Sequence, residues 1–293
     1  MILRHVRDSA ADAETVREIA QAAFGRLTAR PDGTPGHRPT EAQDIFHRAR
    51  TRHLAATDPG GCWLALSGER PVGFALSLRR EGLWALALTA VLPEYQGRGI
   101  GRLLLERAGE HGHGCLRGMI TVSVDPAAAR RYRLAGFHLH PTMRLTGLVD
   151  RDRLPPPSDL AVLPGTVKHQ ELLDSIDRRV RGSAHGPDHP MMLAHYEELL
   201  VCDTVVGSGY CYRDGGTVKL LAATSKRLAA RLLAEALARV PVGTPAKVEW
   251  LTAEQEWAVD VGLELGLTLE NHGYLAVRGM QPPPAYLPSG GFL

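Results

Sequence analysis

The chain has 293 residues, longer than the roughly 100–200 residues of a typical domain, so two domains of similar length are expected. Its 44% hydrophobic and 23% charged residues are near the averages of globular proteins, which excludes a disordered or collagen-like chain. The net charge is +2, with acidic and basic residues interleaved, and this argues against nucleic acid as a partner.

The first half of the chain alternates strands and helices. In chain order we predict a strand over 2–6, helices over 11–27 and 40–56, strands over 62–66, 72–78 and 83–92, a helix over 99–111, a strand over 119–124, a helix over 126–135 and a strand from 137. Thr40 is the expected N-cap of the second helix. Hairpin-length turns separate the three strands between 62 and 92, which predicts an antiparallel meander. Residues 28–39, rich in Pro and Gly, are expected to form a loop.

The second half repeats this order. Residues 150–158 hold three successive prolines among charged residues, so we place a linker there, between a domain of 1–149 and one of 159–293. The elements predicted beyond it are helices over 170–180 and 191–200, strands over 204–212 and 217–222, a helix over 226–238, a strand over 247–252 and a helix over 254–265. Aligning Val72-Gly73 with Val206-Gly207 preserves the order of elements, which indicates a duplicated domain.

The cysteines and the hydropathy of the sequence indicate the expected cellular location. The cysteines lie far apart without C-x-x-C spacing, which fits neither a zinc site nor a disulfide framework, so we interpret them as reduced thiols. The sequence shows no apolar signal segment and no run of the ~18 apolar residues that a membrane span needs. We therefore expect a cytoplasmic protein without a membrane partner.

A glycine-rich segment stands where a predicted strand gives way to a helix. It reads Gln96-Gly97-Arg98-Gly99-Ile100-Gly101-Arg102. Glycines here would let backbone amides approach an anion closely. The first turn of the following helix adds unpaired N–H groups and the positive end of its dipole. The segment therefore predicts a diphosphate-binding loop.

Two commoner phosphate loops are excluded at named positions. A dinucleotide fingerprint beginning at Gly97 needs Gly or Ala where Arg102 stands. A P-loop needs a lysine, and residues 1–167 contain none.

The remaining pattern is Gln96-x-x-Gly99-x-Gly101, preceded by Val91-x-Pro93 and followed by three leucines. It closely resembles motif A of the GNAT acetyltransferase superfamily. The resemblance implies an α/β (α+β, mixed-sheet) fold of two tandem GNAT-like domains, each a central, mostly antiparallel sheet flanked by helices. It also implies that acetyl-CoA is the co-substrate, with its pyrophosphate on the loop amides and its pantetheine arm at the end of the preceding strand. The implied CoA-binding residues are Val91, Gln96, Gly97, Arg98, Gly99, Gly101, Arg102 and Asp125.

A second stretch, residues 125–137, is similar to the family's other CoA-side helix. Tyr132 falls on the position of the family's usual general acid, which implies that its phenol protonates the departing CoA thiolate. Asp125 stands where the family often has Asn. The counterpart of motif A in the second half, residues 220–233, has no glycine, so we predict that this half does not bind CoA and serves as a structural partner that shapes the acceptor pocket.

The general base is not assigned. Many GNAT enzymes carry a glutamate on the strand before the loop, but residues 84–91 contain no carboxylate. Glu81, His138 and His140 are alternatives. The last 15 residues, 279–293, have no charged side chain but several apolar ones, so we expect them to dock on the protein. By resemblance to tandem acetyltransferases that modify aminoglycosides, the terminal carboxylate of Leu293 is a further catalytic candidate beside Tyr132.

His185, Asp188 and His189 lie close together in a Gly/Pro-rich stretch. Their spacing permits a metal, but we favour a loop between two helices that faces the acceptor cleft or the domain interface. Because GNAT chemistry needs no metal, we expect none.

These observations predict an acetyl-CoA-dependent N-acetyltransferase that transfers an acyl group by direct attack of an amine. The acceptor would be a small molecule or a peptide, and the protein a monomer or homodimer. A non-catalytic acyl-CoA-binding sensor or scaffold is the alternative, because the strand glutamate is missing and the second half is degenerate. Acyl transfer to oxygen or sulfur is a narrower alternative.

Overall fold

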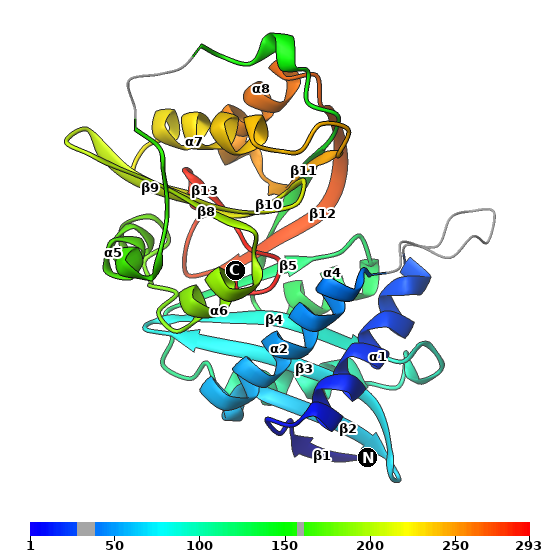
Figure 1. Ribbon diagram of the computed structural model, residues 1–293. Coiled ribbons are helices and arrows are strands. Elements are labelled where there is room, and N and C mark those ends of the chain that lie inside the picture. The colour runs from blue at the N-terminus through cyan, green and yellow to red at the C-terminus, as the bar shows by residue number, and fades with distance from the viewer. Residues whose placement is uncertain (28–38, 157–160) are drawn as a thin grey trace. The chain divides into compact units, whose positions relative to one another are not determined.

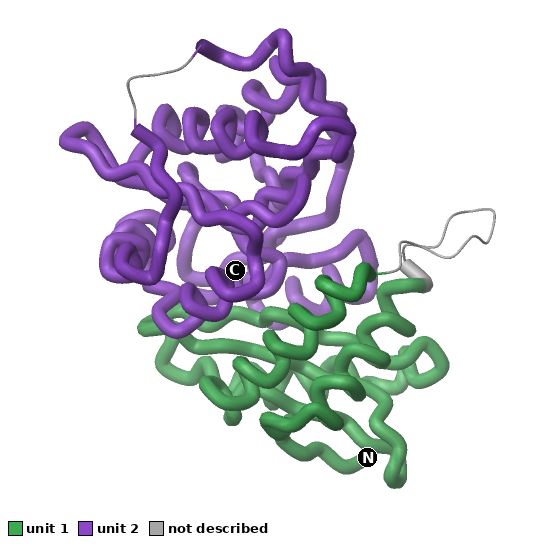
Figure 2. The backbone as a smooth tube through the Cα atoms, in the orientation of Figure 1, with its two compact units in different colours: residues 1–116 green, residues 117–293 purple. Residues whose placement is uncertain are grey.

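The computed structural model describes residues 1–27, 39–156 and 161–293. These residues form two compact units, 1–116 and 117–293, drawn in different colours in Figure 2. The loop predicted over residues 28–39 lies outside the described residues except at its last position, as do the last two residues of the predicted linker.

The first unit is an antiparallel sheet with three helices. Its strands follow the order β1 (Ile2–His5), β2 (Cys62–Ser67), β3 (Arg70–Arg80) and β4 (Leu83–Val91). Its helices are α1 (Ala10–Leu27), α2 (Glu41–Thr57) and α3 (Ile100–Glu110). Helices α1 and α2 pack against each other and on β3, whereas α3 contacts β2, β3 and β4 (Figure 1). The predicted meander is therefore confirmed.

Local sequence explains where these helices form. Thr40 caps α2 as predicted: its Oγ1 accepts the N–H of Gln43 at 3.3 Å, and Gln43 Oε1 accepts the N–H of Thr40 at 2.9 Å. The two bonds form a capping box, which satisfies two otherwise unpaired donors. In α3, Ile100, Leu104 and Ala108 recur at helical spacing and are buried, so one face of this helix packs on the sheet.

The second unit contains a longer sheet. Its elements are β5 (Arg117–Val122), α4 (Pro126–Leu134), β6 (His138–Gly147), β7 (Leu163–Pro164), α5 (Gln170–Val180), α6 (Asp188–His195), β8 (Glu198–Thr204), β9 (Gly207–Asp214), β10 (Thr217–Ala223), α7 (Lys226–Ala238), β11 (Ala246–Leu251), α8 (Glu256–Glu264), β12 (Thr268–Arg278) and β13 (Tyr286–Leu287). The strand order is β5-β12-β6-β11-β10-β9-β8-β7, with β13 paired to β10. Within it β10 and β11 are parallel, and the other described pairs are antiparallel.

The two halves of the chain exchange strands inside this second unit. Strand β12, from the second half, lies between β5 and β6 of the first half. Strand β6 in turn lies between β12 and β11 of the second half. This exchange explains why the compact units divide before residue 117 and not at residues 150–158. The division into domains 1–149 and 159–293 stays a prediction about the repeat.

The repeat is visible in the order of elements. Three antiparallel strands precede α3 in the first half, and β8, β9 and β10 precede α7 in the second. Each helix is followed by strand, helix and strand: β5, α4 and β6, or β11, α8 and β12. Helix α7 begins after Ser225, whose Oγ accepts the N–H of Leu228 at 3.3 Å, and its buried leucines pack on β9 and β10.

Two predictions in the second half are wrong. The helix predicted over 191–200 ends at His195, and Glu198 begins strand β8. The apolar run from Leu199 to Val201 fits either state by itself, but it pairs with β9 across a turn at 205–206. The strand predicted over 204–212 is accordingly the end of β8 and most of β9. Strand β13 was not predicted.

A buried ion cluster holds α2 to β3 and to the end of α3 in the first unit. Asp58 is 2% exposed. Its Oδ2 accepts from Arg80 at 2.8 Å, its Oδ1 accepts the N–H of Arg79 at 2.8 Å, and the same Oδ1 lies 3.0 Å from His111 Nε2. Burial alone would raise the pKa of Asp58, but the hydrogen bond with His111 and the charge of Arg80 lower it to about 2.

The first unit is therefore expected to lose stability in acid through Asp58. Its pKa is lower in the folded protein than in the unfolded one, so the carboxylate stabilises the fold above about pH 4, and this contribution of about 2 kcal/mol is lost as the pH falls towards 2. Asp58→Asn should cost about 3 kcal/mol at pH 7, since the buried guanidinium of Arg80 loses the opposite charge beside it. Urea unfolding at pH 7 and pH 3 measures both effects.

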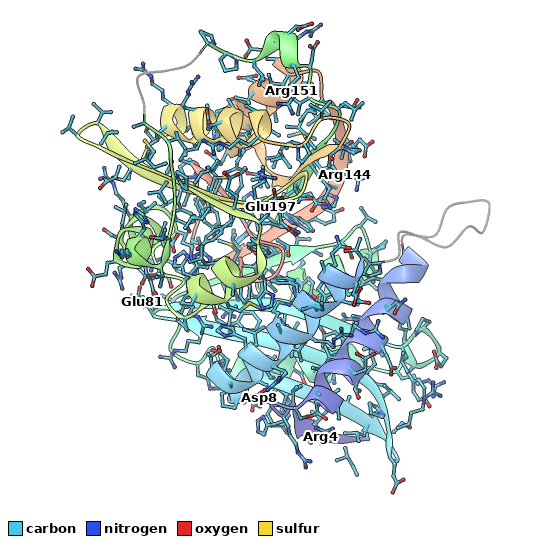
Figure 3. The ribbon with its side chains drawn as sticks, viewed as in Figure 1. Arg4, Asp8, Glu81, Arg144, Arg151 and Glu197 are labelled. Atoms are coloured by element: carbon cyan, nitrogen blue, oxygen red, sulfur yellow. The ribbon has the colours of Figure 1, made fainter. Side chains whose placement is uncertain are left out.

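The matched control is Asp8→Asn, which removes a half-exposed ion pair with Arg52 near β1 (Figure 3) and should cost less than about 1 kcal/mol. A cost of Asp58→Asn that is the same at both pH values would contradict the assignment.

Candidate functional site

The predicted loop connects β4 to α3 within the first unit. A short turn over Pro93–Tyr95 follows the strand, and Gln96 folds back so that its Nε2 donates to the carbonyl of Val91 at 2.9 Å. Gly97 and Gly99 have φ angles of 76° and 82°, in the left-handed region that favours glycine. A Cβ at either glycine would meet no protein atom within 4 Å, so the fold leaves open space there.

The amides of this loop converge on the start of α3. The N–H groups of Arg102 and Leu103 both donate to the carbonyl of Gly99 at 3.1 Å. Among the described residues, no acceptor takes the five N–H groups from Gly97 to Gly101. Five such donors beside a helix N-terminus have the chemistry to bind an anion with several oxygens, such as a diphosphate.

Two guanidinium groups flank these amides. Arg98 donates to the carbonyl of Glu94 at 2.8 Å and lies 5.0 Å from the centre of the Tyr95 ring. Arg102 has a side chain 79% exposed, with Glu106 3.4 Å from its Nε. Gly101 is buried inside the first turn of α3. The structure thus gathers the candidates from Val91 to Arg102 into one local site.

Tyr132 and Asp125 both lie at helix α4, in the second unit. Tyr132 is 4% exposed, and its hydroxyl has no hydrogen-bond partner among the described residues. Burial raises the pKa of Tyr132 to about 12, so the phenol remains a proton donor at neutral pH. Asp125 is the N-cap of α4, and its Oδ1 accepts the N–H of Ala127 at 2.9 Å. This cap gives Asp125 a structural role, which does not depend on the predicted contact with CoA.

The C-terminal segment docks in the second unit, as predicted. Phe292 and Leu293 are fully buried, and the N–H of Leu293 donates to Ser289 at 2.9 Å. A terminal oxygen of Leu293 accepts from the guanidinium of Arg181, which also donates to the carbonyl of Ser183 at 2.8 Å. The carboxylate therefore anchors the tail, and its role as a catalytic base stays a prediction.

The same segment covers the end of β10, which corresponds to β4 in the repeat. Strand β13 pairs with Leu221 and Ala222, and the carbonyl of Ala285 accepts the N–H of Ala223 at 3.0 Å. The preceding prolines are held from α8 and the turn before it: Pro283 and Pro284 accept from Gln255 at 2.7 Å and from Trp257 at 2.8 Å. The backbone at this strand end is thus already hydrogen-bonded. This supports the prediction that the second half does not bind CoA.

The other candidate bases differ in their surroundings. Glu81 lies at the exposed turn between β3 and β4 (Figure 3). His138 and His140 are on β6. Burial and the nearby His138 lower the pKa of His140, so its imidazole is neutral at pH 7 and can accept a proton.

The stretch that holds His185, Asp188 and His189, predicted as a loop between two helices, connects α5 to α6 and continues into the start of α6. The two histidines meet Asp177 of α5. One ring nitrogen of each histidine and a carboxylate oxygen of Asp177 lie within 4.8 Å of one another. Asp188 instead begins α6, where its N–H donates to the carbonyl of His185 at 3.2 Å. Nothing in the sequence indicated that Asp177 lies beside the two histidines, because Asp177 is on the preceding helix.

None of the helices in the described ranges is long and apolar enough to cross a bilayer.

The chain was compared with known families and with curated proteins. Residues 15–148 match the model of the acetyltransferase (GNAT) family. No curated protein matches the sequence.

Solved structures are similar over nearly the whole chain. A proposed acetyltransferase from Pyrococcus horikoshii has a TM-score of 0.75 at 17% identity, covering 100% of this chain and 95% of the other. A GCN5-related N-acetyltransferase from Sphaerobacter thermophilus has a TM-score of 0.56 at 14% identity, covering 96% of each chain. A tandem GNAT protein from the clavulanic acid biosynthesis pathway has a TM-score of 0.54 at 16% identity, covering 96% of this chain and 100% of the other.

The chain therefore has the fold of the GNAT acetyltransferases. Residues 15–148 match the GNAT acetyltransferase family model, and the chain as a whole has the tandem GNAT fold. The predicted family and fold class are confirmed. At these identities the similar structures show the fold alone.

Proposed function

We propose that this protein is an acetyl-CoA-dependent N-acetyltransferase whose first half binds the thioester. The observation that carries the proposal is the row of five N–H groups from Gly97 to Gly101, at the start of α3, for which the described part of the chain offers no acceptor. Left-handed glycines expose these amides, and Arg98 and Arg102 add positive charge beside them. A CoA pyrophosphate has the charge and the oxygens to satisfy such a site.

In the proposed reaction the amine nitrogen of the acceptor attacks the thioester carbonyl carbon directly. A C–N bond forms and the C–S bond breaks. The hydroxyl of Tyr132 gives its proton to the leaving thiolate, while a base takes the proton of the amine. His140, neutral at pH 7, and the carboxylate of Leu293 are the candidates for this base. Holding both reactants in a ternary complex would supply much of the rate acceleration.

The acceptor is proposed to be an amine of a small molecule or a peptide. The transfer step itself needs no metal. A cytoplasmic location, a monomeric or homodimeric state and the absence of nucleic-acid and membrane partners stay predictions from the sequence.

One observation favours a second function, a sensor or scaffold that binds acyl-CoA without turnover. Strand β4, from Leu83 to Val91, carries no carboxylate, so the base is missing from the place where GNAT enzymes commonly have it. Such a protein would bind acyl-CoA at the loop but would not catalyse acyl transfer.

Two measurements on the full chain separate these functions. Acetyl-CoA at 100 times its dissociation constant should stabilise the protein by about 2.7 kcal/mol, visible as a higher melting temperature. Release of free CoA thiol is then followed with a panel of amines. Acceptor-dependent release is expected for the enzyme. Stabilisation without release across the panel would favour the sensor, and the lack of any stabilisation would contradict both functions.

A further inference from the structure

Three buried side chains that no step of the proposed reaction uses converge at one point of the second unit. Asp177 Oδ2 lies 2.7 Å from His185 Nδ1 and 3.0 Å from His189 Nε2. All three side chains are at most 2% exposed. They come from α5, from the connection between α5 and α6, and from α6 itself.

The backbone around them is fixed by local hydrogen bonds. The N–H of Arg181 donates to the carbonyl of Asp177 at 2.8 Å, and the N–H of Gly186 donates to Asp174 Oδ1 at 2.8 Å. Asp174 and Asp177 are three residues apart on α5 and share one face of the helix. The ligand atoms are therefore held in place by the connection.

Each of the three side chains also has a tyrosine at its outward atom. The hydroxyl of Tyr210 donates to Asp177 Oδ1 at 2.5 Å. His189 Nδ1 lies 3.2 Å from the hydroxyl of Tyr212, and His185 Nε2 lies 3.5 Å from that of Tyr286. Metal ligands characteristically have such partners on the atom that faces away from the metal, because the partner orients the ring or carboxylate.

A cation would complement the chemistry of this cluster. Its members are one carboxylate and two imidazoles, all of them buried. The nearby guanidinium of Arg181 is bound to the carboxylate of Leu293. A divalent ion among these three side chains would offset the cost of burying the carboxylate of Asp177.

We propose that Asp177, His185 and His189 bind one divalent transition-metal ion, Zn²⁺ in the first place, as a structural ion of the second unit. Two imidazoles and a carboxylate are ligands that suit Zn²⁺, at about 2.0–2.2 Å from the ion. Asp174 Oδ1, 3.6 Å from His189 Nε2, is the neighbouring carboxylate for a fourth position. With both carboxylates the ion is neutralised, and it ties α5, α6 and the connection between them.

Metal analysis of the wild-type protein tests this first. The full chain is purified without a histidine tag or chelator, and metals are measured by mass spectrometry. About one ion per chain is expected. After chelation, Co²⁺ should restore one equivalent and give absorption between about 500 and 650 nm, as expected for nitrogen and oxygen ligands in a low-coordinate site. Metal should also raise the melting temperature.

Less than about 0.1 ion per chain, with no Co²⁺ absorption in a protein whose circular dichroism shows a complete fold, would overturn the proposal.

Matched variants locate the ion. His189→Gln should bind less than a tenth of the metal of the wild type. The control His169→Gln changes a partly exposed histidine in the same unit and should keep full stoichiometry, because glutamine also completes the capping box with Thr166. Loss of metal in both variants would contradict the assignment to this cluster. If His189→Gln does not fold, the wild-type metal content still decides.

Discussion

Replacing Gly99 by valine is expected to raise the dissociation constant for acetyl-CoA at least 100-fold. Gly99 has a φ of 82° as the N-cap of α3, a conformation that a β-branched residue adopts only with strain of roughly 1–2 kcal/mol. Either the backbone shifts and turns the amides away, or the new side chain enters the open space beside them. A 100-fold weakening corresponds to about 2.7 kcal/mol, close to the loss of one or two charge-assisted hydrogen bonds. Isothermal titration measures it.

Gly109→Ala is the control on the same helix. Gly109 lies near the end of α3, and its Cβ would also meet no atom within 4 Å. This change should leave acetyl-CoA binding unchanged and should stabilise the helix by up to about 1 kcal/mol. Melting temperatures without ligand show whether Gly99→Val still folds. A folded Gly99→Val protein with less than a threefold change in affinity would remove the loop from the proposed binding site.

Tyr132→Phe is expected to lower kcat by 10²- to 10⁴-fold and to leave the affinity for acetyl-CoA unchanged. The variant keeps the buried ring and removes only a hydroxyl that has no partner among the described residues, so stability should change little. Without the phenol, CoA must leave as an unprotonated thiolate. Steady-state thiol release with a saturating acceptor gives kcat, and titration gives the affinity.

The pH profile adds a second readout for Tyr132. Its pKa is raised by burial to about 12, so the phenol stays protonated up to about pH 11 and should cause no alkaline loss of activity between pH 7 and 10. Tyr196→Phe, in the second half, should retain full kcat as the control. If Tyr132→Phe retains it as well, another group or a water molecule is the acid.

The docked tail occupies the end of β10 in the second half. Strand β13 satisfies this strand end with the chain's own backbone, and the Arg181–Leu293 pair fixes the terminus (marked C in Figure 1). In the proposed function the two halves of the repeat therefore differ: the first would bind the anion at its loop amides, whereas the second fills the corresponding strand end with peptide.

Features that depend on near neighbours could be predicted from the amino-acid sequence. The spacing of apolar residues predicted helices α3, α5 and α7, and Thr40 predicted the start of α2. The glycines between Gln96 and Arg102 predicted the loop. Each of these features depends on contacts within a few residues. The order of the predicted elements indicated the repeat, and the resemblance of the loop to motif A indicated the family.

Features that join distant segments of the chain could not be predicted in this way, because they depend on the folded structure. The exchange of β6 and β12, the strand at residues 198–204, the docking of β13 and the pairing of both histidines with Asp177 arise from hydrogen bonds and burial between residues far apart in the chain. Short apolar runs such as Leu199–Val201 have no period that distinguishes strand from helix. Whether such a run forms a strand depends on the segment with which it pairs, here β9. For the same reason the sequence showed only Asp188 as a carboxylate close to His185 and His189. In the folded chain these two histidines lie beside Asp177, which belongs to the preceding helix.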